Sequence, residues 1–150
     1  MTTRTQFRHL EAPADLHAAF GIMQQLRPHL RDSQAFASQV ARQQAQGYHL
    51  LAACTDGAVV GLAGYRLQEN LIYGRFVYVD DLVMDAGRQR GGLGGELLGK
   101  VREQAVALGC AHFVLDTGLH MALAQRFYFR QGLLARGLHF SEPLPAGGVA

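Results

Sequence analysis

The residues with the clearest chemical potential lie in one glycine-rich run, Gln89-Arg90-Gly91-Gly92-Leu93-Gly94-Gly95. A strand-like segment precedes the run and a helix-like segment follows it. Four glycines in five residues let the backbone approach a ligand closely and adopt positive φ. The first N–H groups of the following helix have no internal partners, and the helix dipole adds partial positive charge there. The run therefore predicts an anion site suited to a pyrophosphate, with Arg88, Gln89 and Arg90 as further donors.

Other interpretations of this run are a flexible turn without a ligand and two known phosphate motifs. A glycine-rich loop taken alone is about equally well explained by the flexible turn. No Gly-Lys-Ser/Thr sequence ends the loop, which excludes the phosphate loop of NTPases. The run also lies late in the chain, after several antiparallel-looking strands, where the first crossover of a Rossmann fold would not lie.

The elements that would position this run follow the order β-α-α-β-β-β-α-β-α-β. Strands are expected over residues 5–10, 48–54, 58–67, 76–84, 112–117 and 133–140. Helices are expected over residues 13–30, 33–46, 92–108 and 119–131. The pattern predicts a single α/β (α+β) domain over residues 1–150, with a mixed sheet, helices on both faces and a loose tail at 141–150.

Composition restricts the classes of partner. With 14 basic and 12 acidic residues, the net charge of +2 gives no argument for binding nucleic acid or an anionic membrane surface. Cys54 and Cys110 are isolated within apolar runs, so we expect buried free thiols in a reducing cytoplasm and no metal site. No apolar run approaches the ~20 residues of a membrane helix.

Two blocks of sequence resemble motifs of the GNAT family of N-acetyltransferases. Residues 82–94 resemble motif A, a strand followed by Arg/Gln-x-x-Gly-x-Gly/Ala, with Gln89, Gly92 and Gly94 at the defining places. Residues 124–133 resemble motif B, with a tyrosine, Tyr128, four residues before a glycine. The resemblance covers roughly residues 5 to 140. It implies a mostly antiparallel central sheet of about six to seven strands, flanked by about four helices.

The resemblance further implies an enzyme that uses acetyl-CoA as its cosubstrate. The strand Leu82-Val83-Met84 would splay from the neighbouring Leu115-Asp116-Thr117, so that its unpaired amides bind pantetheine and the acetyl carbonyl. The pyrophosphate would lie on the loop. The implied donor-binding residues are Leu82, Val83, Met84, Gln89, Arg90, Gly91, Gly92, Leu93, Gly94 and Gly95.

Proton transfer needs an acid for the departing thiolate and an acceptor for the proton of the amine. Tyr128 is the candidate acid, because a phenol with a pKa near ~10 is protonated at neutral pH. Asp81 and His120 are candidates for the proton acceptor, with Asp80 and Glu69 as alternatives. Alternation along a strand predicts that Asp80 and Asp81 face opposite sides, and either could instead bind a nearby arginine. His120 is equally consistent with a substrate contact or a helix start.

Further strings, Tyr78-Val79-Asp80-Asp81-Leu82-Val83 and Arg126-Phe127-Tyr128-Phe129-Arg130, are similar to a bacterial small-molecule branch of the family. That branch includes aminoalkylphosphonate acetyltransferases, and some members carry histone-acetyltransferase-like names. The near-zero net charge argues against a histone tail and favours a small-molecule amine. The loops and the first two helices, which would bind the amine, carry no motif, so the identity of the amine stays open.

Other functions remain open beside this one. They are a non-catalytic acyl-CoA-binding or sensing module, a protein or peptide N-acetyltransferase, and a nucleotide-binding regulator. Family members often pair as homodimers through sheet edges or the C-terminal strand, and the open edge strands expected here allow a homodimer.

Overall fold

The computed structural model describes residues 4–88 and 91–146, and these fall into two compact units that divide after Leu115. The first unit holds a five-stranded sheet in the order β1-β2-β3-β4-β5. The strands are β1 (Thr5–His9), β2 (Tyr48–Thr55), β3 (Ala58–Asn70), β4 (Gly74–Met84) and β5 (His112–Leu115). The helices of this unit are α1 (Pro13–Leu26), α2 (Ser33–Gln44), the short 3-10 helix η1 (Ala86–Arg88) and α3 (Leu93–Ala107). The first four strands pair antiparallel, and β5 pairs parallel to β4.

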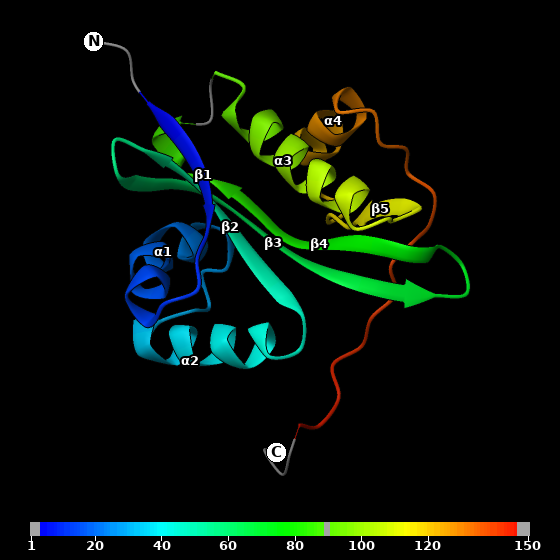
Figure 1. The fold of residues 1–150 in the computed structure, drawn as a ribbon. Helices are drawn as coiled ribbons and strands as arrows, with labels where there is room; N and C mark the ends of the chain where they lie inside the picture. The colour runs from blue at the N-terminus through cyan, green and yellow to red at the C-terminus, as the bar shows by residue number, and fades with distance from the viewer. Residues whose placement is uncertain (1–3, 89–90, 147–150) are drawn as a thin grey trace. The chain divides into compact units, whose positions relative to one another are not determined.

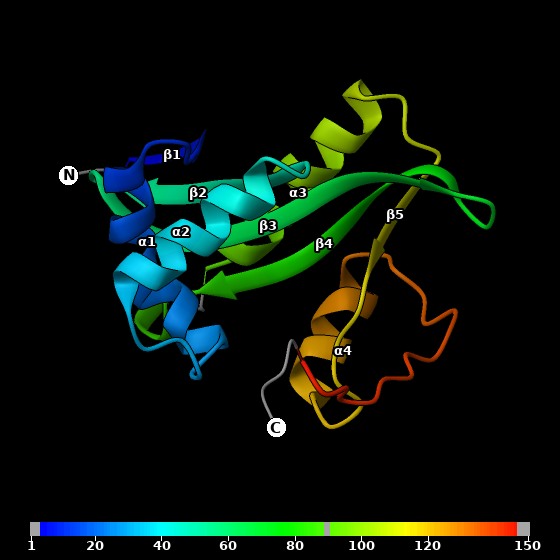
Figure 2. The ribbon, with the colours of Figure 1, turned by 90° about the horizontal axis from the view of Figure 1, so that it is seen from below.

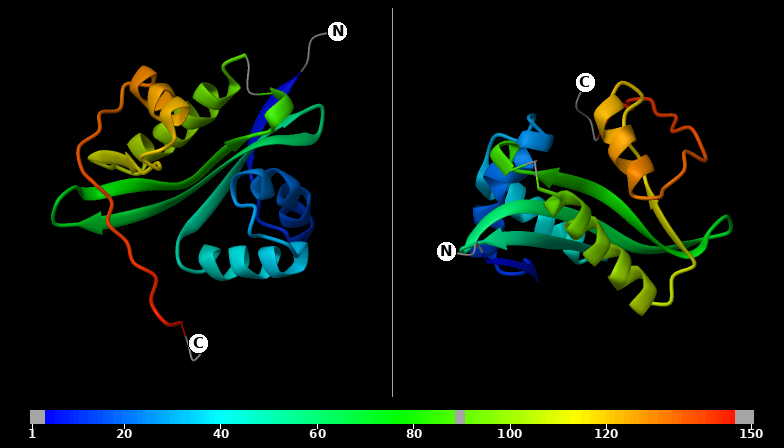
Figure 3. Two further views of the ribbon diagram at one scale, coloured as in Figure 1. Left: turned by 180° about the vertical axis from the view of Figure 1, so that it is seen from behind. Right: turned by 90° about the horizontal axis from the view of Figure 1, so that it is seen from above.

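Helices cover both faces of this sheet, as the sequence predicts. Helices α1 and α2 pack together on one face, whereas α3 runs along the other (Figures 1 and 2). The view from above in Figure 3 shows α3 on the near side of the strands and α1 and α2 on the far side. On the α3 face, Leu97, Leu98 and Val101 are fully buried, as the apolar positions of a helix that packs on a sheet should be.

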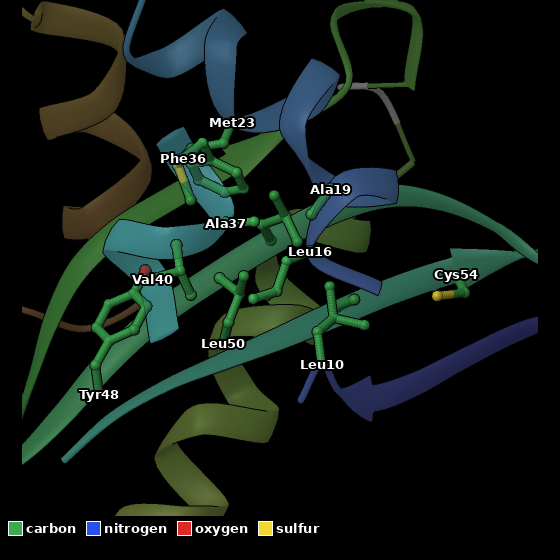
Figure 4. Close-up of a cluster of buried hydrophobic side chains, with 12 residues drawn as sticks. Leu10, Leu16, Ala19, Met23, Phe36, Ala37, Val40, Tyr48, Leu50 and Cys54 are labelled. Carbon is green, nitrogen blue, oxygen red and sulfur yellow. The ribbon is translucent and has the colours of Figure 1, made fainter. Parts of the chain in front are cut away.

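The core on the other face joins the first two helices to β2 and β3 (Figure 4). Leu16, Ala19 and Met23 come from α1, and α2 contributes three further apolar residues. They pack on alternate residues of β2, because side chains of one parity share a face of the sheet. The cluster consists of Leu10, Leu16, Ala19, Met23, Phe36, Ala37, Val40, Tyr48, Leu50, Ala52, Cys54 and Leu62. Cys54 is buried as expected, whereas Cys110 is only half-buried.

Local signals explain most of the element ends. Helix α1 ends at Leu26 rather than at the expected residue 30, because Pro28 disfavours the helical conformation of the residue before it, and Arg27 has φ −119° and ψ 75°. Asp32 caps α2 by accepting a hydrogen bond from the Gln34 amide at 3.0 Å. The β2–β3 turn has φ 51° at Asp56 and φ 84° at Gly57, the positive φ values that a two-residue hairpin turn requires.

The second unit, Asp116–Ala150, contains α4 (Ala122–Arg130). The helix begins three residues later than predicted, after a turn held by Gln125, whose side-chain amide donates to the carbonyl groups of Gly118 and Leu119. The predicted strand at 133–140 is wrong, since these residues have no regular secondary structure. Strand β5 is also shorter than the predicted 112–117. The described sheet therefore has five strands instead of the expected six to seven.

A strand needs a neighbour for its backbone hydrogen bonds, and the described residues supply none to the segment 133–140. Its alternating apolar side chains Leu134, Leu138 and Phe140 are exposed. Residues 141–146 of the expected loose tail also lack regular structure, and residues 147–150 lie outside the described residues.

Candidate active site

The glycine run forms the start of α3, as predicted. Gly91 has φ 115° and Gly92 has φ 78°, and Gly92 is the N-cap residue in a left-handed conformation. Both positions need glycine because the left-handed region is costly for other residues. Among the described residues, no atom lies within 4 Å of a Cβ atom placed at either position, which leaves open space on this side of the loop. Leu93, Gly94 and Gly95 form the first turn of α3. The predicted donors Gln89 and Arg90 lie outside the described residues.

The second half of β4 has an open edge within the first unit. The parallel pairing of β4 with β5 extends from Phe76–His112 to Val79–Leu115 and then stops. At the end of β4 the Asp85 amide donates to the Val60 carbonyl of β3 at 2.8 Å. Backbone groups alternate in direction along a strand, so the amides of Leu82 and Met84 point away from β3, to the open edge. The same alternation turns the Val83 amide towards β3.

A β-bulge interrupts β4 at the two aspartates. Gly64 pairs with Asp81, but the next pair along the strands is Tyr65 with Val79. Asp80 is therefore an extra residue that has no partner of its own on β3. An extra residue reverses the alternation of side chains beyond it. The prediction that Asp80 and Asp81 face opposite sides is wrong, because the bulge turns both carboxylates to the face covered by α1 and α2, where both line one cavity.

Asp81 is the centre of a hydrogen-bond network. Its Oδ1 accepts from Nε and Nη2 of Arg27 at 3.1 Å and 2.9 Å. Its Oδ2 accepts from the hydroxyl of Tyr48 at 2.7 Å. Arg27 is the residue that follows α1, so this network ties the start of the α1–α2 connection to the bulge of β4. Burial, followed by the charge of Asp81, raises the pKa of Tyr48 well above 10.0, so the hydroxyl stays a donor.

Asp80 has a different arginine as its partner. Arg66 donates from Nε to Oδ2 and from Nη2 to Oδ1, each at 2.7 Å, which is the bidentate arrangement of guanidinium and carboxylate. The guanidinium also lies over the ring of Tyr78, 5.6 Å from its centroid. Nη2 of Arg27 donates to the backbone carbonyl of Asp80 at 2.8 Å. Both arginines therefore bind the bulge residue, one through its backbone and the other through its side chain.

These residues line a cavity of about 410 Å³ between the bulge and the first two helices. The α1–α2 connection and α2 supply most of the remaining wall. The lining residues are Met23, Arg27, His29, Leu30, Phe36, Gln39, Gln43, Gln46, Tyr48, Arg66, Asp80 and Asp81. The cavity volume is in the range of small-molecule sites.

Gly64 makes room for the network. It lies on β3 opposite Asp81. A Cβ atom there would overlap the hydroxyl of Tyr48 and lie 2.8 Å from Oδ2 of Asp81. The absence of a side chain at this position therefore allows the tyrosine and the aspartate to meet.

The remaining predicted residues lie elsewhere. Tyr128 is half-buried on α4 in the second unit, in edge-to-face contact with Phe127, and burial raises the pKa of its phenol. His120 is exposed in the turn before α4, where a Cβ on Gly118 would lie 2.7 Å from its ring. Glu69 is exposed near the end of β3, outside the residues that line the cavity.

Sequence reasoning missed Arg27, Tyr48 and Arg66. An arginine partner for the paired aspartates is one of the alternatives that the sequence leaves open, and the structure identifies Arg27 and Arg66. Tyr48 has no comparable signal, since a tyrosine at the start of a buried strand is explained by packing alone.

Comparison with known proteins agrees with this geometry. The family model described as "Acetyltransferase (GNAT) family" matches residues 12–133. The chain belongs to the GNAT family. Members of this family are acetyltransferases. The matched residues include both the glycine run and Tyr128. Comparison with proteins of curated function finds no match in sequence.

Solved structures share the GNAT fold along almost the whole chain. An acetyltransferase of Trypanosoma brucei has a TM-score of 0.79 and 23% identity, covering 94% of this chain and 100% of that one. The aminoglycoside N-acetyltransferase AAC(6')-Iy in complex with CoA has a TM-score of 0.81 and 17% identity, covering 96% and 98%. Glucosamine-6-phosphate N-acetyltransferase of Arabidopsis thaliana has a TM-score of 0.76 and 16% identity, covering 93% and 98%. At these identities the likeness establishes the fold.

Two further observations concern the described residues alone. Among residues 4–88 and 91–146, no group of three His, Cys, Asp or Glu side chains is arranged as metal ligands would be. No helix in the same ranges has the length and hydropathy to span a membrane.

Proposed function

We propose that this GNAT protein transfers the acetyl group of acetyl-CoA to a primary amine of a small molecule by direct attack of the amine on the thioester. The observation that carries the proposal is the start of α3, where Gly91 and Gly92 have positive φ and open space above them. Backbone N–H groups at a helix start bind phosphate oxygens. The loop residues therefore fit the pyrophosphate of CoA.

The open edge of β4 supports the second half of the donor site. The amides of Leu82 and Met84 face this edge, and we assign them to the pantetheine arm and the acetyl carbonyl. Donors that are fixed in a strand stabilise the developing oxyanion without reorganisation. The amide of Val83 faces β3, so this residue lies between the two donors but donates no hydrogen bond to the ligand.

Tyr128 would donate a proton to the departing thiolate of CoA. The pKa of its phenol is raised by burial, which keeps the hydroxyl protonated at neutral pH and suits it to the role of an acid. The amine must attack in its neutral form. The hydrogen bonds that Asp81 already accepts from Arg27 and Tyr48 favour a role in holding the cavity wall rather than in accepting the proton of the amine.

The cavity between the bulge and helices α1 and α2 would hold the acceptor. It lies beside β4, the strand assigned to the acetyl carbonyl, and it is lined mainly by polar side chains. Acetyltransferases of similar fold form complexes with a bisubstrate analogue and with sisomicin, which supports a small-molecule acceptor. A cytoplasmic location and a homodimer remain part of the proposal, the latter because β5 is an edge strand.

Thermal denaturation with acetyl-CoA, ATP or NAD tests the donor site first. A rise in Tm with acetyl-CoA alone is expected. Amine-dependent release of free CoA thiol then tests turnover. Tyr128→Phe should lower kcat by roughly 10²-fold or more, the contribution of a general acid, and leave the Tm rise unchanged. No rise in Tm at millimolar acetyl-CoA would exclude the proposal. A rise in Tm without turnover on any amine would favour a sensing module.

A further inference from the structure

Both carboxylates in the cavity are paired with a guanidinium group. Asp81 accepts three hydrogen bonds, two from Arg27 and one from Tyr48. Asp80 accepts one on each oxygen from the guanidinium of Arg66. A carboxylate that already has its charge balanced by a guanidinium attracts an incoming ammonium group weakly. Each ion pair has no net charge, so a ligand in the cavity is selected by the hydrogen-bonding groups that the pairs leave unused.

The two guanidinium groups do have unused donors. A guanidinium carries five N–H bonds, and both arginines use only Nε and Nη2 in their hydrogen bonds to the aspartates. Within the described part of the chain, Nη1 of Arg27 and Nη1 of Arg66 have no hydrogen-bond partner. The side chains are 43% and 39% exposed, so a ligand in the cavity can reach them.

The two guanidinium groups share one residue, because Arg27 binds the carbonyl of Asp80 while Arg66 binds its carboxylate. The salt bridges hold both side chains in place, which lowers the entropy lost when a ligand binds. Pairs of positioned N–H donors match the geometry of carboxylate and phosphoryl oxygens. The neighbouring Gln39, Gln43 and Gln46 are neutral and add no competing negative charge.

We propose that the acceptor amine carries an anionic group, a carboxylate or a phosphoryl group, which Nη1 of Arg27 and Nη1 of Arg66 bind. This inference rests on the proposed N-acetyltransferase function. The amine at the other end of the acceptor then has no unpaired carboxylate of the cavity beside it, because Asp80 and Asp81 are both paired with arginines. Such a site does not stabilise the ammonium form, so it favours the neutral amine that attacks the thioester.

Four primary amines of similar length test the preference by CoA thiol release at saturating acetyl-CoA. They are β-alanine, O-phosphoethanolamine, 3-aminopropan-1-ol and 1,3-diaminopropane. The kcat/KM of at least one anionic amine should exceed that of the amino alcohol and the diamine by at least about tenfold, as expected for a charge-assisted pair of hydrogen bonds. The better of the two anionic amines identifies the group as carboxylate or phosphoryl.

Arg66→Lys provides the matching variant, since lysine keeps a positive charge for Asp80 but loses the second pair of N–H donors. The preference for the anionic amine should fall at least about fivefold through a higher KM for the amine, while the KM for acetyl-CoA stays unchanged. Arg42→Lys, on the exposed side of α2 and outside the cavity lining, is the control and should leave both constants unchanged.

The outcomes separate this inference from the function on which it rests. Equal rates with all four amines or a preference for the diamine would overturn the inference alone. No reaction of any of them while acetyl-CoA still raises Tm would favour a sensing module and remove the inference together with the enzyme function. An unchanged preference in Arg66→Lys would also overturn it. Absence of any Tm rise with acetyl-CoA would remove the proposed function and the inference together.

Discussion

The hydroxyl of Tyr48 offers a direct test of the network that joins the bulge to the helices. Tyr48→Phe removes only the oxygen that donates to Oδ2 of Asp81 at 2.7 Å. Tyr48 is 2% exposed and the side chain of Asp81 is 15% exposed, so water replaces the lost donor poorly. A hydrogen bond to a charged group contributes roughly 1.5–3 kcal/mol. We expect the free energy of unfolding to fall by about 2 kcal/mol.

Urea denaturation followed by circular dichroism measures this change, with the slope m as the check that unfolding stays comparable. Tyr65→Phe is the matched control. Its hydroxyl bonds His9 at 2.7 Å, and burial lowers the pKa of that histidine, which favours the neutral form. The loss there should be only ~1 kcal/mol. A double-mutant cycle of Tyr48→Phe with Asp81→Asn should give a coupling energy of ~1–2 kcal/mol.

Two results would refute this reasoning. A loss below ~0.5 kcal/mol, the range of an ordinary surface substitution, would mean that water replaces the hydroxyl fully. Additive effects of Tyr48→Phe and Asp81→Asn would mean that the two side chains contribute to stability independently.

Three further predictions follow from other parts of the structure. Gly64→Ala should lower the free energy of unfolding by about 1–3 kcal/mol through overpacking, whereas Gly99→Ala, in helix α3 with no atom within 4 Å of a new Cβ, should raise it by up to ~1 kcal/mol. Gly92→Ala, at φ 78°, should weaken acetyl-CoA binding measured by calorimetry, because a strained loop start misplaces the amides; an unchanged Kd would count against the loop as the pyrophosphate site. Burial, with a smaller contribution from His49, lowers the pKa of His9 below its ordinary value of 6.5. The unfolded chain therefore binds more protons just below pH 6.5, and stability should fall as pH decreases from that value. His9→Phe should flatten this part of the stability–pH curve, and an unchanged curve would exclude His9 as its source.

Much of the fold could be predicted because its signals are local. The Asp56-Gly57 turn, the Asp32 cap and the glycine start of α3 each depend on the conformational preference of one or two residues. The apolar stripe of α3 follows from helical periodicity. The end of α1 was placed four residues too late, although Pro28 carries a local signal for it.

The site could be predicted only in part. The glycine loop and the strand before it follow from a motif, so the sequence predicts both elements, and their role in binding the donor stays a prediction. The cavity proposed for the acceptor is not predicted, because it combines Arg27, the residue after α1, with residues of α2 and of the three strands β2, β3 and β4. Contacts between residues that lie 54 positions apart, as in Arg27 and Asp81, have no trace in local sequence patterns.

The strand predicted at 133–140 illustrates a different limit. Its alternation of apolar residues is typical of a strand, but a strand exists only where another strand satisfies its backbone. That partner is decided by tertiary or quaternary pairing and not by the segment itself.

By itself, the sequence determined the order of elements as far as α4, the turn and cap residues and the glycine start of α3, because these follow from backbone preferences and periodicity within a few residues. Only the tertiary structure decided the bulge at Asp80, which turns two neighbouring carboxylates to one face. The reason is that a bulge depends on the register between two strands, and register is set by packing across the sheet. The same packing selected Gly64, Tyr48 and the two arginines as partners of the aspartates, and so defined the cavity in which we place the acceptor.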